Sequence, residues 1–182
     1  METERLIIDA LKNEDKEAYF RNISHDKEVL KTFICRYAET LEDLDFEPYV
    51  NREDMFAIRL KDTGELIGLI LYFDDDGESL EIGYGIGSSY WGKGYAFEAV
   101  KRFLEFCFYE KGVRRVCASF FTGNEASKRV MEKCGMTYDH FSPQELTYLG
   151  VPRDLIYYSI RKNDYDIMFP TMKEPSGKGG NR

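Results

Sequence analysis

The chain has 182 residues, 43% of them hydrophobic and 15% aromatic, which suits one domain with a substantial core. Its net charge of -8 at pH 7 argues against a protein whose main partner is nucleic acid, because phosphate-backbone binding needs clustered Lys and Arg. No window approaches the roughly 18 apolar residues of a membrane-spanning helix, so we expect a cytoplasmic protein that does not bind a membrane.

The first half of the chain predicts a strand, two helices and then three more strands. Residues 6–8 form a short apolar run, and residues 13–23 and 27–41 repeat apolar side chains at helical spacing. Three apolar runs follow, separated by the turn sequences KDTGEL and DDDGES, and they predict an antiparallel meander. These runs are residues 55–60, 67–73 and 80–87.

The second half alternates helices and strands before a closing hairpin. Gly112 is placed to end the first of these helices, and Asn124 to begin the second. The last two strands are expected to be joined by the sequence VPR. This order predicts an α+β fold with one mixed, mostly antiparallel sheet flanked by helices. The predicted elements are helix 94–109, strand 113–121, helix 124–135 and strands 136–141, 146–150 and 154–160.

The C-terminal stretch TMKEPSGKGGNR has almost nothing apolar to bury. Segments of this kind cannot offset the entropy of ordering, so residues 170–182 are predicted to be a disordered tail. No linker composition interrupts the rest of the chain, and we expect a single domain over residues 1–169.

Neither the cysteines nor the histidines have the spacing of a metal site. The four cysteines include no CxxC pair and lie mostly in apolar stretches, which indicates reduced, buried thiols and a reducing compartment. His25 and His140 are isolated, with no Cys or carboxylate at ligand spacing, so no metal is expected.

The segment IGYGIGSSYWGKGYAFEAVKRF crowds glycines in front of a predicted helix, so the main chain bends sharply there or lets a ligand approach closely. A nucleotide P-loop fits Gly87, Gly92 and Lys93, but Gly94 stands where the magnesium-binding hydroxyl is required. A dinucleotide-binding fingerprint fits Gly92 and Gly94, but Phe97 takes the third glycine position and the preceding strands are antiparallel.

A third interpretation needs only the main chain. Unobstructed N–H groups from Gly92 to Ala96 lead into a helix N-terminus, where unpaired donors and the helix dipole both attract anions. A pyrophosphate fits such a site without a metal. The alternative is a tight strand-to-helix turn that holds no ligand.

Two blocks of sequence favour the anion site. YWGKGYAFEAV and the later NEASKRVMEKCGM resemble the acetyl-CoA signature of the GNAT N-acetyltransferase superfamily, particularly its branch of ribosomal-protein alanine N-acetyltransferases. In that signature Gln or Arg, then Gly, then Gly or Ala surround the pyrophosphate, and the matching positions are Trp91, Gly94 and Ala96. TERLII, LEIGYGIG and LGVPRDLIYYSI are similar to that branch's opening strand, central strand and closing hairpin, although IDAL stands where an Arg usually follows.

The resemblance implies the GNAT fold and acetyl-CoA as co-substrate. Asn124 then contacts the pantetheine arm, caps its helix, or does both, and Lys128 either reaches the cofactor or is simply solvated. The glycines of LEIGYGIG predict a bulge that frees main-chain groups for the donor, against the alternative of a plain central strand. The predicted donor-binding residues are Tyr84, Gly85, Ile86, Trp91, Gly92, Lys93, Gly94, Tyr95, Ala96, Asn124, Ser127 and Lys128.

Acyl transfer to an amine needs a neutral nitrogen, and an alkylamine with a pKa near 10 is only about one part in a thousand neutral at pH 7. Glu81, just before the strand glycines, is the predicted base, acting through water, or else an ordinary strand carboxylate. Many members of the superfamily carry a Tyr as the acid where this chain has Met131, which has no proton to give. A thiolate with a pKa near 8.5 leaves readily, so solvent or Ser127 is the candidate acid.

The acceptor stays open among a protein N-terminus, a polyamine or other small amine, and an aminoglycoside-like drug. By the resemblance, SHDKEV and YLGVPRD bound the acceptor site. The alternative to an enzyme is a sensor module of the same fold that binds acyl-CoA without turnover. Dimers are common in the superfamily, so a homodimer is among the expected assemblies.

Overall fold

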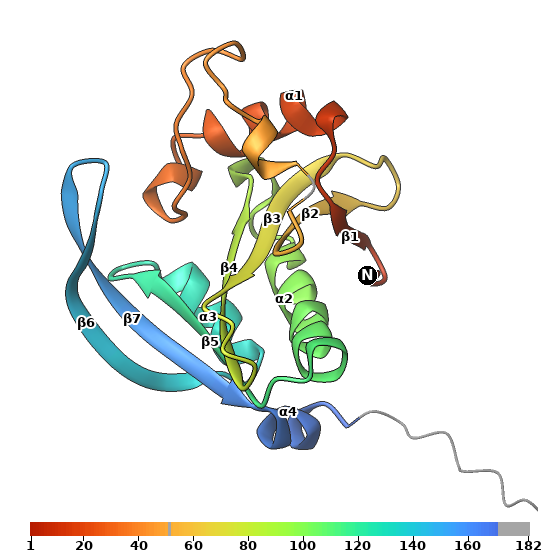
Figure 1. The fold of residues 1–182 in the computed structure, drawn as a ribbon, viewed down its shortest axis with the longest axis vertical. Coiled ribbons are helices and arrows are strands. Elements are labelled where there is room, and N and C mark those ends of the chain that lie inside the picture. Colours follow the sequence, from red (N-terminus) through yellow and green to blue (C-terminus); the bar gives the residue numbers. More distant parts are fainter. Residues whose placement is uncertain (51, 171–182) are drawn as a thin grey trace, which may run out of the picture.

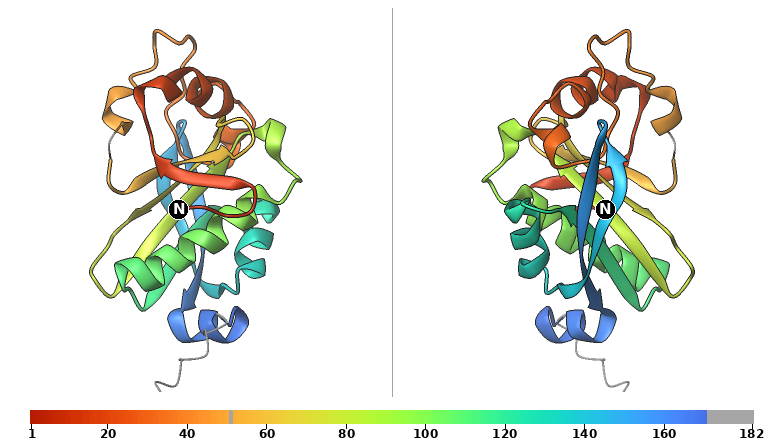
Figure 2. Two further views of the ribbon diagram at one scale, coloured as in Figure 1. Left: turned by 90° about the vertical axis from the view of Figure 1, so that its right-hand side faces the viewer. Right: turned by 90° about the vertical axis from the view of Figure 1, so that its left-hand side faces the viewer.

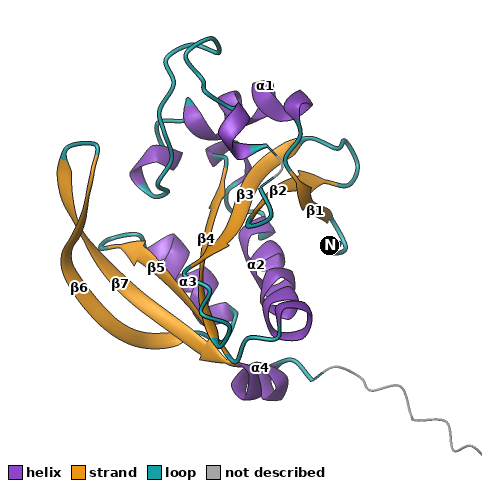
Figure 3. Cartoon of the chain, in the orientation of Figure 1, coloured by secondary structure: helices purple, strands orange, loops and turns teal. Residues whose placement is uncertain are grey.

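One mixed sheet organises the residues that the computed structural model describes, 1–50 and 52–170 (Figures 1 and 3). The strand order is β1-β2-β3-β4-β5-β7-β6, and every neighbouring pair is antiparallel except β4 and β5. The predicted α+β class is therefore confirmed. The strands are β1 Leu6–Ala10, β2 Met55–Leu60, β3 Leu66–Phe73, β4 Ser79–Ile86, β5 Arg115–Phe121, β6 Thr137–Tyr148 and β7 Val151–Arg161.

The helices cover both faces of the sheet, with the N-terminal helical segment on one face and α2 and α3 on the other. The short α1 is extended by a 3₁₀ turn at Asn13–Asp15 and a π-helical turn at Phe20–Ser24, so the helix predicted at 13–23 is confirmed. Figure 2 shows this N-terminal helical segment at the opposite end of the molecule from α4. The helices are α1 Lys16–Tyr19, α2 Tyr95–Glu105, α3 Glu125–Lys133 and α4 Lys162–Met168.

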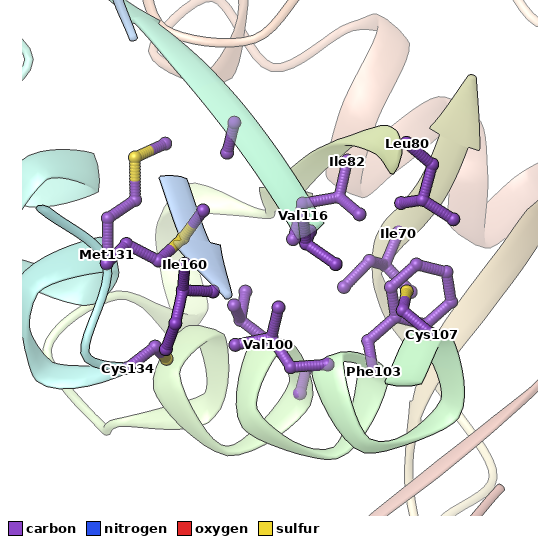
Figure 4. Packing of buried hydrophobic residues seen from close by; sticks show 14 of the residues in the cluster. Ile70, Leu80, Ile82, Val100, Phe103, Cys107, Val116, Met131, Cys134 and Ile160 are labelled. Carbon is purple, nitrogen blue, oxygen red and sulfur yellow. The ribbon is translucent and has the colours of Figure 1, made fainter. Parts of the chain in front are cut away.

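The central strands are buried on both faces, because successive side chains of a strand point to opposite sides. Ile70 of β3 joins the larger core, in which Val100 and Phe103 of α2 and Met131 of α3 pack against the sheet (Figure 4). Its neighbour Leu69 joins a second core on the other face, under the N-terminal helical segment. This double burial explains why β3 is apolar almost throughout.

The sheet opens between β4 and β5. Their parallel pairing runs only from Ser79 opposite Arg115 to Ile82 opposite Ala118. Pairing of β4 with β3 continues without a register shift to Ile86, so the predicted bulge is wrong and β4 separates from β5 without one. The glycines serve another purpose: a Cβ on Gly85 would lie 2.7 Å from the Phe33 ring, so this glycine makes room for an aromatic side chain.

The helix predicted over residues 27–41 is wrong, since only a 3₁₀ turn at Val29–Lys31 forms there. The sequence KTFICRY is rich in β-branched and aromatic residues, which favour helices weakly. Its backbone is instead held by the Tyr148 hydroxyl, which lies 3.2 Å from the Phe33 carbonyl and 3.0 Å from the Cys35 carbonyl. We call residues 32–35 the pinned segment.

The C-terminal part differs from expectation in three places. The hairpin turns at Leu149 and Gly150, both with positive φ, whereas VPR lies inside β7. The separate strands predicted at 136–141 and 146–150 belong to the single long β6, whose pairing with β7 is irregular between Ser142 and Leu146. Helix α4 was not predicted, and it is fastened by the buried Tyr165.

The predicted disordered tail lies outside the described residues except for Pro170, so it stays a prediction, as does the domain boundary at 169. In the described ranges, none of the helices combines the length and the apolarity that crossing a membrane would require.

Candidate active site

A cavity of about 410 Å³, called the donor groove below, lies between β4, the loop 87–94, the start of α2 and the exposed face of α3. Nearly all predicted donor-binding residues line it. These are Tyr84, Gly85, Ile86, Trp91, Gly92, Gly94, Tyr95, Ala96, Asn124 and Ser127. Helix α3 adds two cations, Arg129 and Lys133, that sequence reasoning missed. Arg129 lies three residues after Ala126 and Lys133 three residues after Val130, so the helical spacing alone could have placed all four on one face of α3.

The main chain at the start of α2 forms what we call the amide cradle, Gly92 to Ala96. Gly92 and Gly94 have φ of 75° and 83°, a left-handed conformation that glycine adopts without strain. Within the described residues, the N–H groups of the cradle have no hydrogen-bond acceptor. Gly92, Gly94, Tyr95 and Ala96 all line the donor groove, so the cradle borders open space. The cradle therefore fits a diphosphate.

Arg5 holds the cradle in place from the start of the chain. Its Nη1 donates to the Lys93 carbonyl at 3.0 Å, its Nε donates to Glu98 at 2.7 Å, and its guanidinium stacks over the Tyr95 ring. At the other end of the loop, the indole N–H of Trp91 donates to the Ile86 carbonyl at 2.6 Å. The contacts of Arg5 join residues far apart in sequence, so no local pattern indicated this residue.

Two predicted donor-binding residues do not line the groove. The Lys93 ammonium lies against the Tyr90 ring and donates to the Ser89 carbonyl at 3.3 Å. Lys128 lies 4.0 Å from Glu125 and from Glu132 along the surface of α3, which matches the solvated alternative. The sequence indicated that Lys93 belongs to the cradle, but it could not show that only the main chain of Lys93, and not its side chain, lies there.

The helix cap predicted at Asn124 is confirmed, and the contact with the pantetheine arm stays a prediction. The Asn124 side-chain oxygen accepts from the N–H of Ser127 at 3.2 Å and so caps α3, and the residue also lines the donor groove.

Tyr84 and Ser127 bridge the opening between β4 and α3. Their hydroxyl oxygens lie 2.8 Å apart, and the Tyr84 hydroxyl also donates to the Ser127 carbonyl at 3.2 Å. Burial raises the pKa of Tyr84 well above its usual value, against the lowering effect of Ser127. Tyr84 therefore stays protonated, as a donor at the point where the strands separate.

A second cavity of about 310 Å³, called the acceptor cavity below, lies on the other side of the opening. It shares Thr32, Phe33, Tyr84 and Ser127 with the donor groove, so the two cavities meet beside the Tyr84–Ser127 bond. A thioester held in one cavity and a nucleophile held in the other would therefore come together at this junction.

Glu81 lines the acceptor cavity, and its carboxylate accepts from the Ser119 hydroxyl at 2.8 Å. Burial raises the pKa of Glu81, the Ser119 hydrogen bond lowers it, and the nearby charges of Asp74 and Glu145 raise it further. The Tyr157 ring belongs to the same surroundings, and burial followed by the charge of Glu81 raises its pKa to about 12. An elevated carboxyl pKa in a cleft is the usual property of a general base.

The histidines have structural partners. His25 Nδ1 lies 2.9 Å from the Ala38 carbonyl, and its ring stacks on Phe20. His140 stacks on Tyr157 and lies 2.8 Å from Asp139. Among the residues described, no His, Cys, Asp and Glu side chains gather in a group able to hold a metal ion.

Comparison with known proteins identifies the family. The family model described as acetyltransferase (GNAT) domain matches residues 5–137, most of the chain. The fold and the two joined cavities thus belong to an acyltransferase. The chain is a member of the GNAT acetyltransferase family, as the sequence resemblance predicted.

The most informative relatives are bacterial. The uncharacterized N-acetyltransferase YoaA of Bacillus subtilis (strain 168) is 32% identical over 171 residues, covering 89% of this chain and 96% of the relative. The crystal structure of a GNAT-family acetyltransferase from Bacillus anthracis has a TM-score of 0.79 at 30% identity, covering 90% of this chain and 98% of that one. Ribosomal-protein-S5-alanine acetyltransferase from Vibrio fischeri has a TM-score of 0.73 at 19% identity, with 91% and 97% covered, and at that identity the likeness shows the fold alone.

Proposed function

We propose that this protein transfers the acetyl group of acetyl-CoA directly to a primary amine. The observation that carries the proposal is the meeting of two cavities at the opening of the sheet, with unpaired amides on one side and Glu81 on the other. The family supplies the chemistry, since GNAT acetyltransferases use acetyl-CoA.

The donor groove offers a distinct contact for each part of CoA. The amide cradle receives the diphosphate, and Arg129 and Lys133 add positive charge although the chain as a whole is acidic. From Gly83 to Gly85 the edge of β4 has no β5 partner, so the main-chain groups that point away from β3 are available to the amides of the pantetheine arm. Acetyl-CoA supplies an acetyl group activated as a thioester.

Side chains of the protein accept the proton from the amine and donate one to the leaving sulfur. Glu81 accepts the proton that the acceptor ammonium must lose, directly or through one water, because most alkylamines are charged at pH 7. As the C–N bond forms and the C–S bond breaks, Ser127 donates a proton to the sulfur, a role supported by the Tyr84 hydroxyl oxygen 2.8 Å from that of Ser127. A thiolate with a pKa near 8.5 is a good leaving group, so a weak donor is sufficient.

The compartment is part of the proposal. Cys35, Cys107, Cys117 and Cys134 are all free thiols, which supports a reducing, cytoplasmic setting. The acceptor amine is carried by a small molecule or by a protein N-terminus.

Release of free CoA thiol from acetyl-CoA, measured with and without added amines, tests the proposal. Amine-dependent release with formation of the matching amide is the expected result. Binding of CoA with no release by any amine or peptide would contradict it and would support a sensor module of the same fold.

A further inference from the structure

The acceptor cavity has one acidic side chain in its wall. Among the described residues that line it, Glu81 is the only Asp, Glu, Lys, Arg or His, and aromatic rings make up much of the remaining wall. These rings belong to Tyr19, Phe33, Tyr49, Phe73, Tyr84, Phe120 and Phe121. A cavity of this kind provides one counter-ion for an ammonium group and an apolar environment for what the ammonium is attached to.

The cavity runs from a buried floor to an exposed apolar rim. Tyr19, Met55 and Leu69 form part of the floor and are at most 6% exposed. At the rim, Ile34 is 53% exposed and Phe73 is 38% exposed, although both are large and apolar. Exposed apolar residues that border a cavity mark a surface that a ligand covers.

The wall that carries Ile34 is already in position. Tyr148 ties the pinned segment to the β6–β7 hairpin through the Phe33 and Cys35 carbonyls, and it accepts the Cys35 N–H at 3.4 Å. A wall held by hydrogen bonds loses little further entropy on binding, so its shape selects among ligands.

We propose that the acceptor is a primary monoamine on a single compact apolar body, either a free arylalkylamine or the N-terminus of a peptide that begins with a large apolar residue. This inference rests on the proposed function and narrows its substrate class. A polyamine or an aminoglycoside would place further ammonium groups among aromatic walls that offer no second carboxylate.

The charges outside the cavity do not change this conclusion. Asp74, which follows β3, and Glu145 on β6 influence Glu81, but neither lines the cavity. Arg153, whose guanidinium carbon lies 5.3 Å from the Phe121 ring centroid, does not line it either. The acidic residues outside can attract an ammonium group, while the interior selects for the apolar body.

The test measures kcat/KM for thiol release with amines of similar basicity: 2-phenylethylamine, ethanolamine and spermidine. A phenyl group that leaves water for this cavity is expected to raise kcat/KM about 10- to 100-fold over ethanolamine. Two peptides that differ only in starting with Phe or with Ser separate the peptide source from the free amine.

A matched pair of variants locates the effect. Ile34 lines the cavity, whereas Ile167 lies on α4 and is 79% exposed, so truncating either is expected to disturb the fold little. Ile34→Ala is expected to lower kcat/KM for 2-phenylethylamine about 3- to 10-fold with little change for ethanolamine, and Ile167→Ala to change neither.

The outcomes separate this inference from the proposed function. Preference for 2-phenylethylamine or for the Phe peptide, reduced by Ile34→Ala, supports it. Equal or better use of spermidine or ethanolamine overturns the inference and leaves the acetyltransferase in place. If CoA binds but none of the amines or peptides causes thiol release, both the proposed function and this inference are overturned.

Discussion

Gly94→Ala probes the amide cradle with a single methyl group. Gly94 has a φ of 83° immediately before α2, and an added Cβ would lie 3.5 Å from Arg5 Nη2, an ordinary contact. The perturbation is therefore backbone strain, about 1–2 kcal/mol for an L residue in this region. We expect the free loop to relax away from the strained conformation, so restoring that conformation opposes binding and weakens CoA affinity on the order of 5- to 30-fold.

Gly112→Ala is the matched control. Gly112 has a φ of 80° beyond the π-helical turn that follows α2, with nothing within 4 Å of an added Cβ, and it does not line the donor groove. Each variant is expected to lower the melting temperature by about 2–8 °C. Calorimetric titration with CoA is expected to show weaker binding for Gly94→Ala alone. Wild-type affinity in both variants would refute the role of the cradle.

Two further predictions concern charge. Glu81→Gln is expected to reduce turnover without changing CoA affinity. In wild type, activity is expected to fall as pH falls through the raised pKa of Glu81, and Glu81→Gln is expected to remove this dependence. An unaltered pH profile of kcat/KM in the variant would exclude Glu81 as the base. Since burial raises that pKa in the folded state, wild type should lose stability relative to Glu81→Gln as pH rises from about 4.3 through the raised value, measured by thermal denaturation. Arg129→Ala, at an exposed position on α3, is expected to weaken CoA binding about 2- to 5-fold at low salt and to flatten its salt dependence, whereas the same substitution at Arg114 is expected to do neither.

Local patterns predicted the parts of the fold that local chemistry determines. β2 begins and ends where expected, and glycines at Gly64 and Gly77 with φ of 73° and 83° make the turns that separate the strands of the meander. Asn124 caps α3 as its side chain predicts, and the cradle glycines, which predicted a sharp bend of the main chain, have a left-handed conformation. Here a residue and its immediate neighbours decide the conformation.

Contacts between distant residues account for what the sequence did not reveal. The pinned segment is not helical because Tyr148, more than a hundred residues later, satisfies its carbonyl groups. Arg5 supports the cradle through Glu98 and Lys93, a pairing that only the adjacency of β1 and α2 creates. The acceptor cavity is also invisible in sequence, because its walls come from the N-terminal segment and from several strands.

The central claim is that unpaired amides from Gly92 to Ala96 bind the diphosphate of CoA without help from a divalent ion. Calorimetric titration of the purified protein with CoA, in the presence and absence of a chelator, tests it most directly. We expect saturable binding of CoA with the same affinity with and without the chelator. Absence of binding heat, or loss of binding when the chelator is present, would contradict it.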